Sequence, residues 1–245
     1  MPRLAYGKPA VLEQPSLYLR ILFENPDYVA VDKPAGFHVH PPEDQRHKIP
    51  RHRNCLALLR DQLGGNYIYP VHRLDGATTG VLFYAKTSEA ASALAGQFKE
   101  RKVQKTYYAV VRGWPEDQVI EKDLDGHPSK TWIRVIAKKE VPVKIGKSKF
   151  ETARYAVIEA QPHTGRMHQI RRHLAGISHP LIGDTVYGDG PHNRYFRELG
   201  MPGLFLRSAR TQVPELGLDV TAGWRGSWHK AWDWFGLCPL INSIS

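Results

Sequence analysis

Cysteine is scarce in this chain of 245 residues, and only Cys55 and Cys238 occur. Two cysteines so far apart exclude a disulfide-rich framework and a cysteine-rich zinc site, and they favour a reducing compartment, the cytoplasm. No apolar run approaches the roughly 18 residues of a transmembrane helix, so no membrane span is expected. The first residues also lack the apolar stretch of a secretory signal peptide.

Several sequence motifs of common enzymes are missing as well. There is no G-x-G-x-x-G for a dinucleotide and no G-x-S-x-G for a serine hydrolase. Twelve histidines suggest a metal site, with His38 and His40 or His168 and His173 as conceivable ligands. However, there is no H-E-x-x-H, no cysteine pair and no carboxylate at a matching spacing. The sequence therefore predicts neither a metal site nor an organic cofactor.

Negative charge is the other shortage. Asp and Glu number 24 against 34 Lys and Arg, which leaves a formal net charge of +10. Such a surplus is typical of proteins with a polyanionic partner, and nucleic acid is the first candidate; a basic surface that only aids solubility is the alternative. Three segments concentrate the charge: residues 46–53 in a proline-rich stretch, residues 101–105, and residues 166–173.

The hydrophobic pattern predicts an α+β fold, because strand-like runs are frequent and no regular βαβ alternation appears. The expected strands are residues 28–31, 80–85, 106–111, 131–137 and 154–160. The expected helices are residues 55–63, 89–101 and 167–174, with Asn54 and either Thr87 or Ser88 as N-caps of the first two. In the third, Met167, Ile170 and Leu174 form the apolar stripe and Arg171 lies off it. The lysine-rich residues 138–149 are expected to form an exposed loop.

Two segments can carry chemistry. Asp75 lies in a polar turn directly before the strand at 80–85, where a rigid sheet can present it to a ligand. Because Asp-Gly is also a common turn dipeptide, a purely structural aspartate is the alternative. Near 164–174, Thr164 and Gly165 are expected to open a helix whose free N–H groups can hold an anion. The alternative there is a solvated basic helix face.

These segments belong to a set of ordered motifs that resembles the RluA-type pseudouridine synthases. The motifs read H-R-L-D-x-x-T-[ST]-G, K-x-Y-x-A-x-V-x-G, T-G-R-x-H-Q-I-R-x-H-L-A and H-P-[IL]-x-G-D-x-x-Y-G. They occupy residues 72–80, 105–113, 164–175 and 179–188, and residues 31–36 match a further upstream element. The sequence departs from the pattern at Thr79, where serine is more usual, and at Leu206-Arg207-Ser208, where the family usually has Leu-His-Ala. The second departure leaves the last strands uncertain.

The resemblance implies an enzyme that converts a uridine in RNA to pseudouridine without a metal or cofactor. Its fold would be the pseudouridine synthase fold, a mixed and mainly antiparallel sheet flanked by a few helices with a central catalytic cleft. By resemblance Asp75 is the catalytic aspartate, Arg171 its cationic partner and Tyr107 the active-site tyrosine. The substrate-binding residues implied are His72, Arg73 and Arg166.

Residues 112–114, 171–174 and 188–194 resemble the TruC-like branch, which acts on position 65 of tRNA. The expected organisation is an N-terminal arm over residues 1–16 and a single catalytic domain over residues 17–245, acting as a monomer. The expected partner is tRNA. Two other hypotheses stay open: the same reaction on ribosomal RNA, and a non-catalytic RNA-binding or RNA-folding protein that keeps the fold.

Overall fold

The computed structural model describes residues 18–39 and 50–237, in which the strands form one ten-stranded sheet. The strands are β1 (Arg20–Glu24), β2 (Tyr28–Lys33), β3 (Tyr69–Pro70), β4 (Thr79–Ala85), β5 (Gln104–Arg112), β6 (Gln118–Glu121), β7 (Lys130–Val141), β8 (Ala153–Pro162), β9 (Leu206–Val213) and β10 (Leu218–Thr221). Their order is β1-β2-β4-β9-β5-β8-β7-β6, with β10 beside β9 and β3 beside β4.

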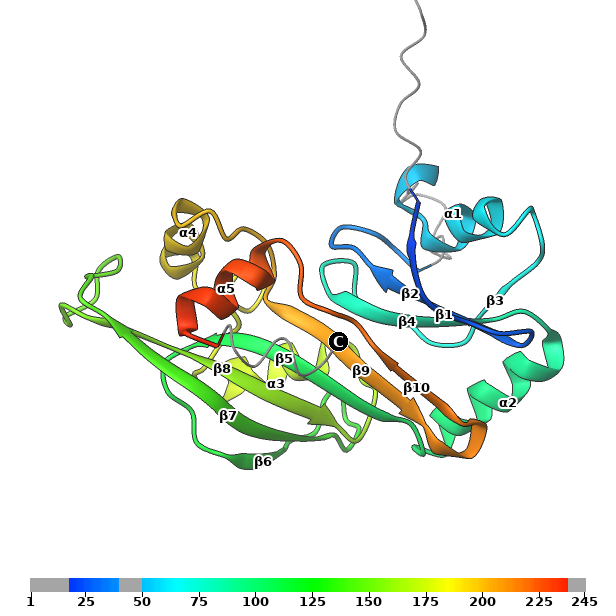
Figure 1. The fold of residues 1–245 in the computed structure, drawn as a ribbon. Helices are drawn as coiled ribbons and strands as arrows, with labels where there is room; N and C mark the ends of the chain where they lie inside the picture. Colours follow the sequence, from blue (N-terminus) through cyan, green and yellow to red (C-terminus); the bar gives the residue numbers. More distant parts are fainter. Residues whose placement is uncertain (1–17, 40–49, 238–245) are drawn as a thin grey trace, which may run out of the picture.

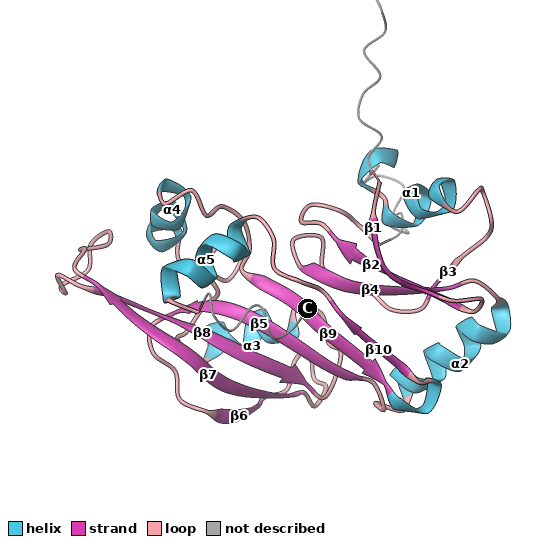
Figure 2. Ribbon diagram, viewed as in Figure 1, coloured by secondary structure: helices cyan, strands magenta, loops and turns pink. Residues whose placement is uncertain are grey.

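Every strand pair is antiparallel except the short pairing of β4 with β9. Helices flank this layer (Figure 2). They are α1 (Cys55–Gln62), α2 (Ser88–Lys99), α3 (Gln169–Gly176), α4 (Gly190–Glu198) and α5 (Ser227–Phe235). Two 3-10 turns complete the elements, η1 (Arg51–Arg53) and η2 (Pro214–Leu216). The predicted α+β class with a mainly antiparallel sheet is confirmed. None of the helices in residues 18–39 and 50–237 has the length and apolar character needed to cross a bilayer.

Both faces of the sheet are covered. Along β8, Ala156 and Ile158 point into a core shared with α1 and α3, while Tyr155 and Val157 point into a second core shared with α4 and α5. A third core lies beneath α2 and against β10. Figure 1 shows α4 and α5 in front of the sheet and α3 behind it. The alternation that typifies strands thus separates two buried cores rather than a core from solvent.

The first two predicted helices are confirmed, caps included. The side chain of Asn54 accepts a hydrogen bond from the Ala57 N–H, and that of Thr87 accepts one from the Ala90 N–H. The third prediction is wrong at its start. Thr164 and Gly165 do not open the helix, because α3 begins only at Gln169 after His168 adopts the left-handed conformation, φ 53°. Met167 is consequently outside the helix and exposed.

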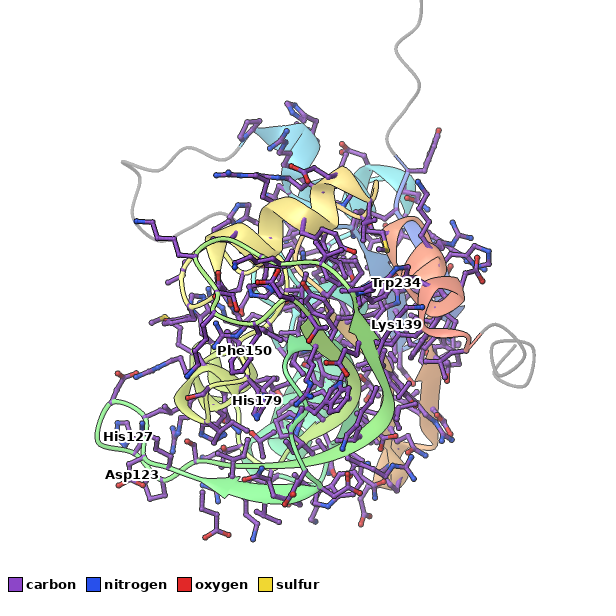
Figure 3. All side chains as sticks on the ribbon, turned by 90° about the vertical axis from the view of Figure 1, so that its left-hand side faces the viewer. Asp123, His127, Lys139, Phe150, His179 and Trp234 are labelled. Carbon is purple, nitrogen blue, oxygen red and sulfur yellow. The ribbon has the colours of Figure 1, made fainter. Side chains whose placement is uncertain are left out.

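The expected loop at 138–149 is also wrong over its first four residues. They continue β7 and pair with β8, from Lys138 opposite Ala156 to Val141 opposite Ala153. Long lysine side chains can lie over apolar surface while their ammonium groups stay in water, so the lysines do not break the strand. The Lys139 ammonium donates to the Trp234 carbonyl where α5 meets β7 (Figure 3).

The helices α4 and α5 were not predicted, and the departure at Arg207 does not disrupt the last strands. Arg207 is buried on β9, and its guanidinium donates to both carboxylate oxygens of Asp32 at 2.9 Å and to the Gly223 carbonyl at 2.5 Å. β10 then pairs with β9 in regular register. The expected arm at 1–16, residues 46–49 of the first basic segment, His40 and Cys238 lie outside the described residues.

Candidate active site

A cavity of about 600 Å³ lies between three segments of the chain. They are the loop before β4, the stretch from the end of α2 into β5, and the loop that leads from β8 into α3. All six residues that the sequence singles out line this cavity: His72, Arg73, Asp75, Tyr107, Arg166 and Arg171. The tertiary structure therefore gathers into one place residues that are far apart in the sequence.

Asp75 is held in a tight turn at the start of β4. Its carbonyl accepts the Thr78 N–H at 3.0 Å, and the next carbonyl, that of Gly76, accepts the Gly36 N–H at 2.8 Å. The Asp75 side chain is 24% exposed, so it faces the cavity rather than the core. The backbone bonds that define this turn hold the main chain from which the carboxylate projects into the cavity.

A buried lysine reinforces the turn. The Lys33 ammonium, on fully buried β2, donates to the carbonyls of Pro34, Phe37 and Gly76 at 2.8–2.9 Å. Burial lowers the pKa of Lys33 to about 8, while the charge of Asp75 acts in the opposite direction. Lys33 therefore ties the segment 33–37 to the residue after Asp75 and places a second positive charge behind the carboxylate. From the sequence alone Lys33 had no predicted role, although it lies in the upstream motif.

Arg171 lies beside Asp75, as the resemblance implied, but it is buried rather than on a solvated face. One of its terminal nitrogens is 3.6 Å from an Asp75 oxygen. Its shorter bonds go elsewhere: the guanidinium forms a bidentate pair with Asp184 at 2.7 and 2.9 Å. Such a two-point contact fixes the plane of the guanidinium. Asp184 thus holds Arg171 in the orientation that faces Asp75.

Asp184 carries its charge inside the protein because donors surround it. Burial alone would raise the pKa of Asp184, but the Arg171 guanidinium and the N–H groups of Val186 and Tyr187 outweigh burial and lower it. The Arg171 guanidinium also lies 5.2 Å from the centre of the Tyr187 ring. Both Asp184 and Tyr187 belong to the fourth motif, which was the available signal for them, yet neither had a predicted role.

Tyr107 lies on β5 at the cavity wall and is 9% exposed. Burial raises the pKa of Tyr107 to about 12; a hydrogen bond with Ser208 works against this shift and the charge of Asp75 adds to it. The ring is therefore a neutral phenol at physiological pH. It can stack on a base and donate its hydroxyl proton, and it becomes a base only by giving up that proton during the reaction.

The remaining predicted residues differ in exposure. Arg73 is exposed at the mouth of the cavity, and Arg166 is half-buried there with a side-chain Nε that meets no partner within the described part of the chain. His72 is turned inward. Its Nε2 accepts the Phe83 N–H at 2.9 Å, and its ring stacks on Phe98 at 4.6 Å between centres.

His168 contributes a second group beside Asp75, with its Nε2 3.8 Å from a carboxylate oxygen and its Nδ1 3.1 Å from the Tyr187 hydroxyl. His173, the other conceivable metal ligand of this helix, instead bonds Ser129 and Thr131 in the interior. Over residues 18–39 and 50–237, no three His, Cys, Asp or Glu side chains gather closely enough to hold a metal ion.

The chain is similar to known proteins over most of its length. Residues 27–176 match the family described as RNA pseudouridylate synthase. The chain is 41% identical over 199 residues to tRNA pseudouridine synthase C of Vibrio cholerae serotype O1, covering 74% of this chain and 78% of that protein. It is 36% identical over 253 aligned positions to the protein of the same name from Yersinia pestis, covering 92% and 95%.

The fold is similar to that of solved structures as well. Human RNA pseudouridylate synthase domain containing 4 superposes with a TM-score of 0.66 at 22% identity, covering 87% of this chain and 92% of that one. Human RNA pseudouridylate synthase domain containing 1 gives a TM-score of 0.65 at the same identity, covering 86% of each chain. At this identity the likeness concerns the fold alone.

Proposed function

The chain belongs to the RNA pseudouridylate synthase family, and we propose that its substrate is tRNA with the target at position 65. Members of this family are isomerases, and this chain converts uridine in RNA to pseudouridine. The names of the relatives from Vibrio cholerae and Yersinia pestis support tRNA. The position rests on residues 112–114, 171–174 and 188–194, which resemble the TruC-like branch. We also propose that it acts as a monomer in the cytoplasm.

The reaction changes the attachment of the base without changing its composition. The bond between N1 of uracil and C1′ of ribose breaks, the base turns, and a bond forms between C5 and C1′. C5 then loses its proton, and N1 gains one. No electrons are gained or lost, so the side chains need to supply only a nucleophile or base, stabilisation of charge and control of the base as it turns.

The observation that carries the assignment is the position of Asp75 in a cavity with Arg171 at 3.6 Å and Tyr107 in the wall. Arg171 stabilises the carboxylate by its permanent charge. The carboxylate can then add to the sugar or base as a nucleophile, or remove a sugar proton on a route through a glycal. Tyr107 stacks on the uracil, and its hydroxyl assists the loss of the C5 proton.

The target base must leave its stack to reach Asp75, so we propose that the uridine flips into the cavity. Arg73, exposed at the mouth, fills the space that the base leaves or holds the backbone beside it. Arg166 grips a phosphate. The inward-facing His72 contributes to substrate binding by shaping the wall between Arg73 and α2, because its ring stacks on Phe98 of that helix.

The direct test is to map pseudouridine in cells with and without this gene, by carbodiimide modification and primer extension across tRNA and ribosomal RNA. The expected result is the loss of one tRNA site at position 65. A lost site in ribosomal RNA would refute the tRNA assignment. If no site is lost, the protein would instead bind or fold RNA without catalysis.

A variant test addresses the aspartate itself. Asp75→Asn is expected to abolish turnover in a tritium-release assay while RNA affinity, measured by filter binding, changes less than about threefold, because the amide keeps the shape but cannot serve as nucleophile or base. The control is Asp123→Asn, an exposed aspartate (Figure 3) that does not line the cavity. Substantial turnover by Asp75→Asn would remove Asp75 from the mechanism.

A further inference from the structure

Lys105 is a cation in the cavity wall that the mechanism above does not use. It lies on β5, and its ammonium makes one long contact, 3.5 Å to the Thr164 carbonyl. Within the described residues no carboxylate pairs with it. Lys33 provides the contrast, because its ammonium donates to three carbonyls at 2.8–2.9 Å. Lys105 is half-buried, and an ammonium that is partly removed from water with a single weak acceptor is costly, so further acceptors are expected from a ligand.

The strand geometry places Lys105 next to Tyr107, on which the target base is proposed to stack. Lys105 and Tyr107 are two residues apart on β5, so their side chains lie on the same face of the sheet about 7 Å apart. That separation is the scale of one nucleotide, from the base across its sugar to the phosphate. The Thr164 contact joins Lys105 to the loop before α3, opposite the turn that holds Asp75.

We propose that Lys105 binds, inside the cleft, a backbone phosphate adjacent to the flipped uridine. This role rests on the proposed function and adds to it a buried contact that fixes the register of the strand. The other charged groups in the cavity are Asp75 and the cations Arg73, Lys99, Arg101, Arg166 and Arg171. Arg73, Lys99 and Arg101 are exposed at the mouth and suited to general attraction, whereas Lys105 and Arg166 are half-buried.

Binding measurements in an Asp75→Asn background test the role without turnover. Lys105→Met keeps the length of the side chain but removes the charge, and it is expected to raise the Kd for a substrate tRNA about 10- to 100-fold. The control, Lys102→Met, removes an exposed lysine that contacts Glu100, and less than about a threefold change is expected. The slope of log K against log salt should also decrease in magnitude by about one for Lys105→Met.

The pH dependence of binding gives a signature that a merely structural lysine would not produce. Burial lowers the pKa of Lys105 to about 8, so the free protein loses this charge as pH rises past 8 and affinity should weaken there. Lys105→Arg keeps its charge and should remove that part of the alkaline loss. Lys33, whose pKa is also about 8, is present in both proteins and cancels in the comparison. His72, the neighbouring ring, is already neutral at these pH values.

A substrate with a neutral methylphosphonate next to the target uridine completes the test. The parent protein should bind this RNA more weakly than normal RNA. Lys105→Met should bind the two RNAs with equal affinity, because the contact between Lys105 and this phosphate is already absent. Equal Kd values for Lys105→Met and Lys102→Met would overturn the phosphate assignment. So would a loss in single-turnover rate at unchanged affinity when Lys105→Met is made in the protein that retains Asp75. If the parent protein binds no tRNA, the proposed function itself fails instead.

Discussion

Replacing His72 by glutamine will make the fold less sensitive to acid. The pKa of His72 is lowered from 6.5 to about 3, first by burial and then by the charge of Lys105. The unfolded chain takes up this proton near pH 6.5, whereas the folded chain resists it until about pH 3. Stability that is complete above pH 6.5 is therefore lost as pH falls. At pH 5 the loss from this one ring is about 2 kcal/mol.

Urea unfolding at pH 7.5 and pH 5 measures the effect. Glutamine offers a carbonyl oxygen to the Phe83 N–H but does not titrate, so His72→Gln should lose about 2 kcal/mol less than the parent between the two pH values. His173, whose pKa burial also lowers, is present in both proteins and cancels. His229→Gln, an exposed position, should behave as the parent. An equal acid loss in His72→Gln and the parent would refute the reasoning.

Two further predictions concern Arg171 and the start of β4. Asp184→Asn removes the bidentate partner of Arg171 and should destabilise the fold by about 3–5 kcal/mol in thermal unfolding. It should also lower kcat more than it raises KM. The control, Asp125→Asn, breaks only the exposed pair with Arg172 and should change neither the stability nor the kinetic constants. Gly80→Ala should lower the free energy of unfolding by more than about 1 kcal/mol, because φ is +109° and a Cβ would lie 2.0 Å from a carbonyl oxygen of β9. Gly96→Ala, in open space on α2, should instead raise the free energy of unfolding by about 0.5–1 kcal/mol, as measured by chemical unfolding.

Short-range features could be predicted from the sequence because their causes lie within a few residues. Asn54 and Thr87 cap the helices that follow them, and the apolar run within β4 is buried on both faces as expected. The order of the motifs along the chain was enough to single out Asp75 with Tyr107 and Arg171, and the three line one cavity. What a motif cannot supply is the role of each member, and Lys33 and Asp184 were left without one for that reason.

Caps and strand propensity are local properties of the chain, and they specify the class of fold. The ordered motifs, read along the whole chain, indicate the family and the residues that meet in the cavity. Which of the charged residues are buried depends instead on tertiary packing. The sequence around Arg171 is also typical of a solvated basic helix face. In the structure Arg171 is buried, because Asp184, 13 residues later, pairs with it in the interior. The lysines at 138–139 are typical of a loop, but in the structure they are part of β7 because they pair with β8. Burial and pairing depend on distant segments, so no local pattern encodes them.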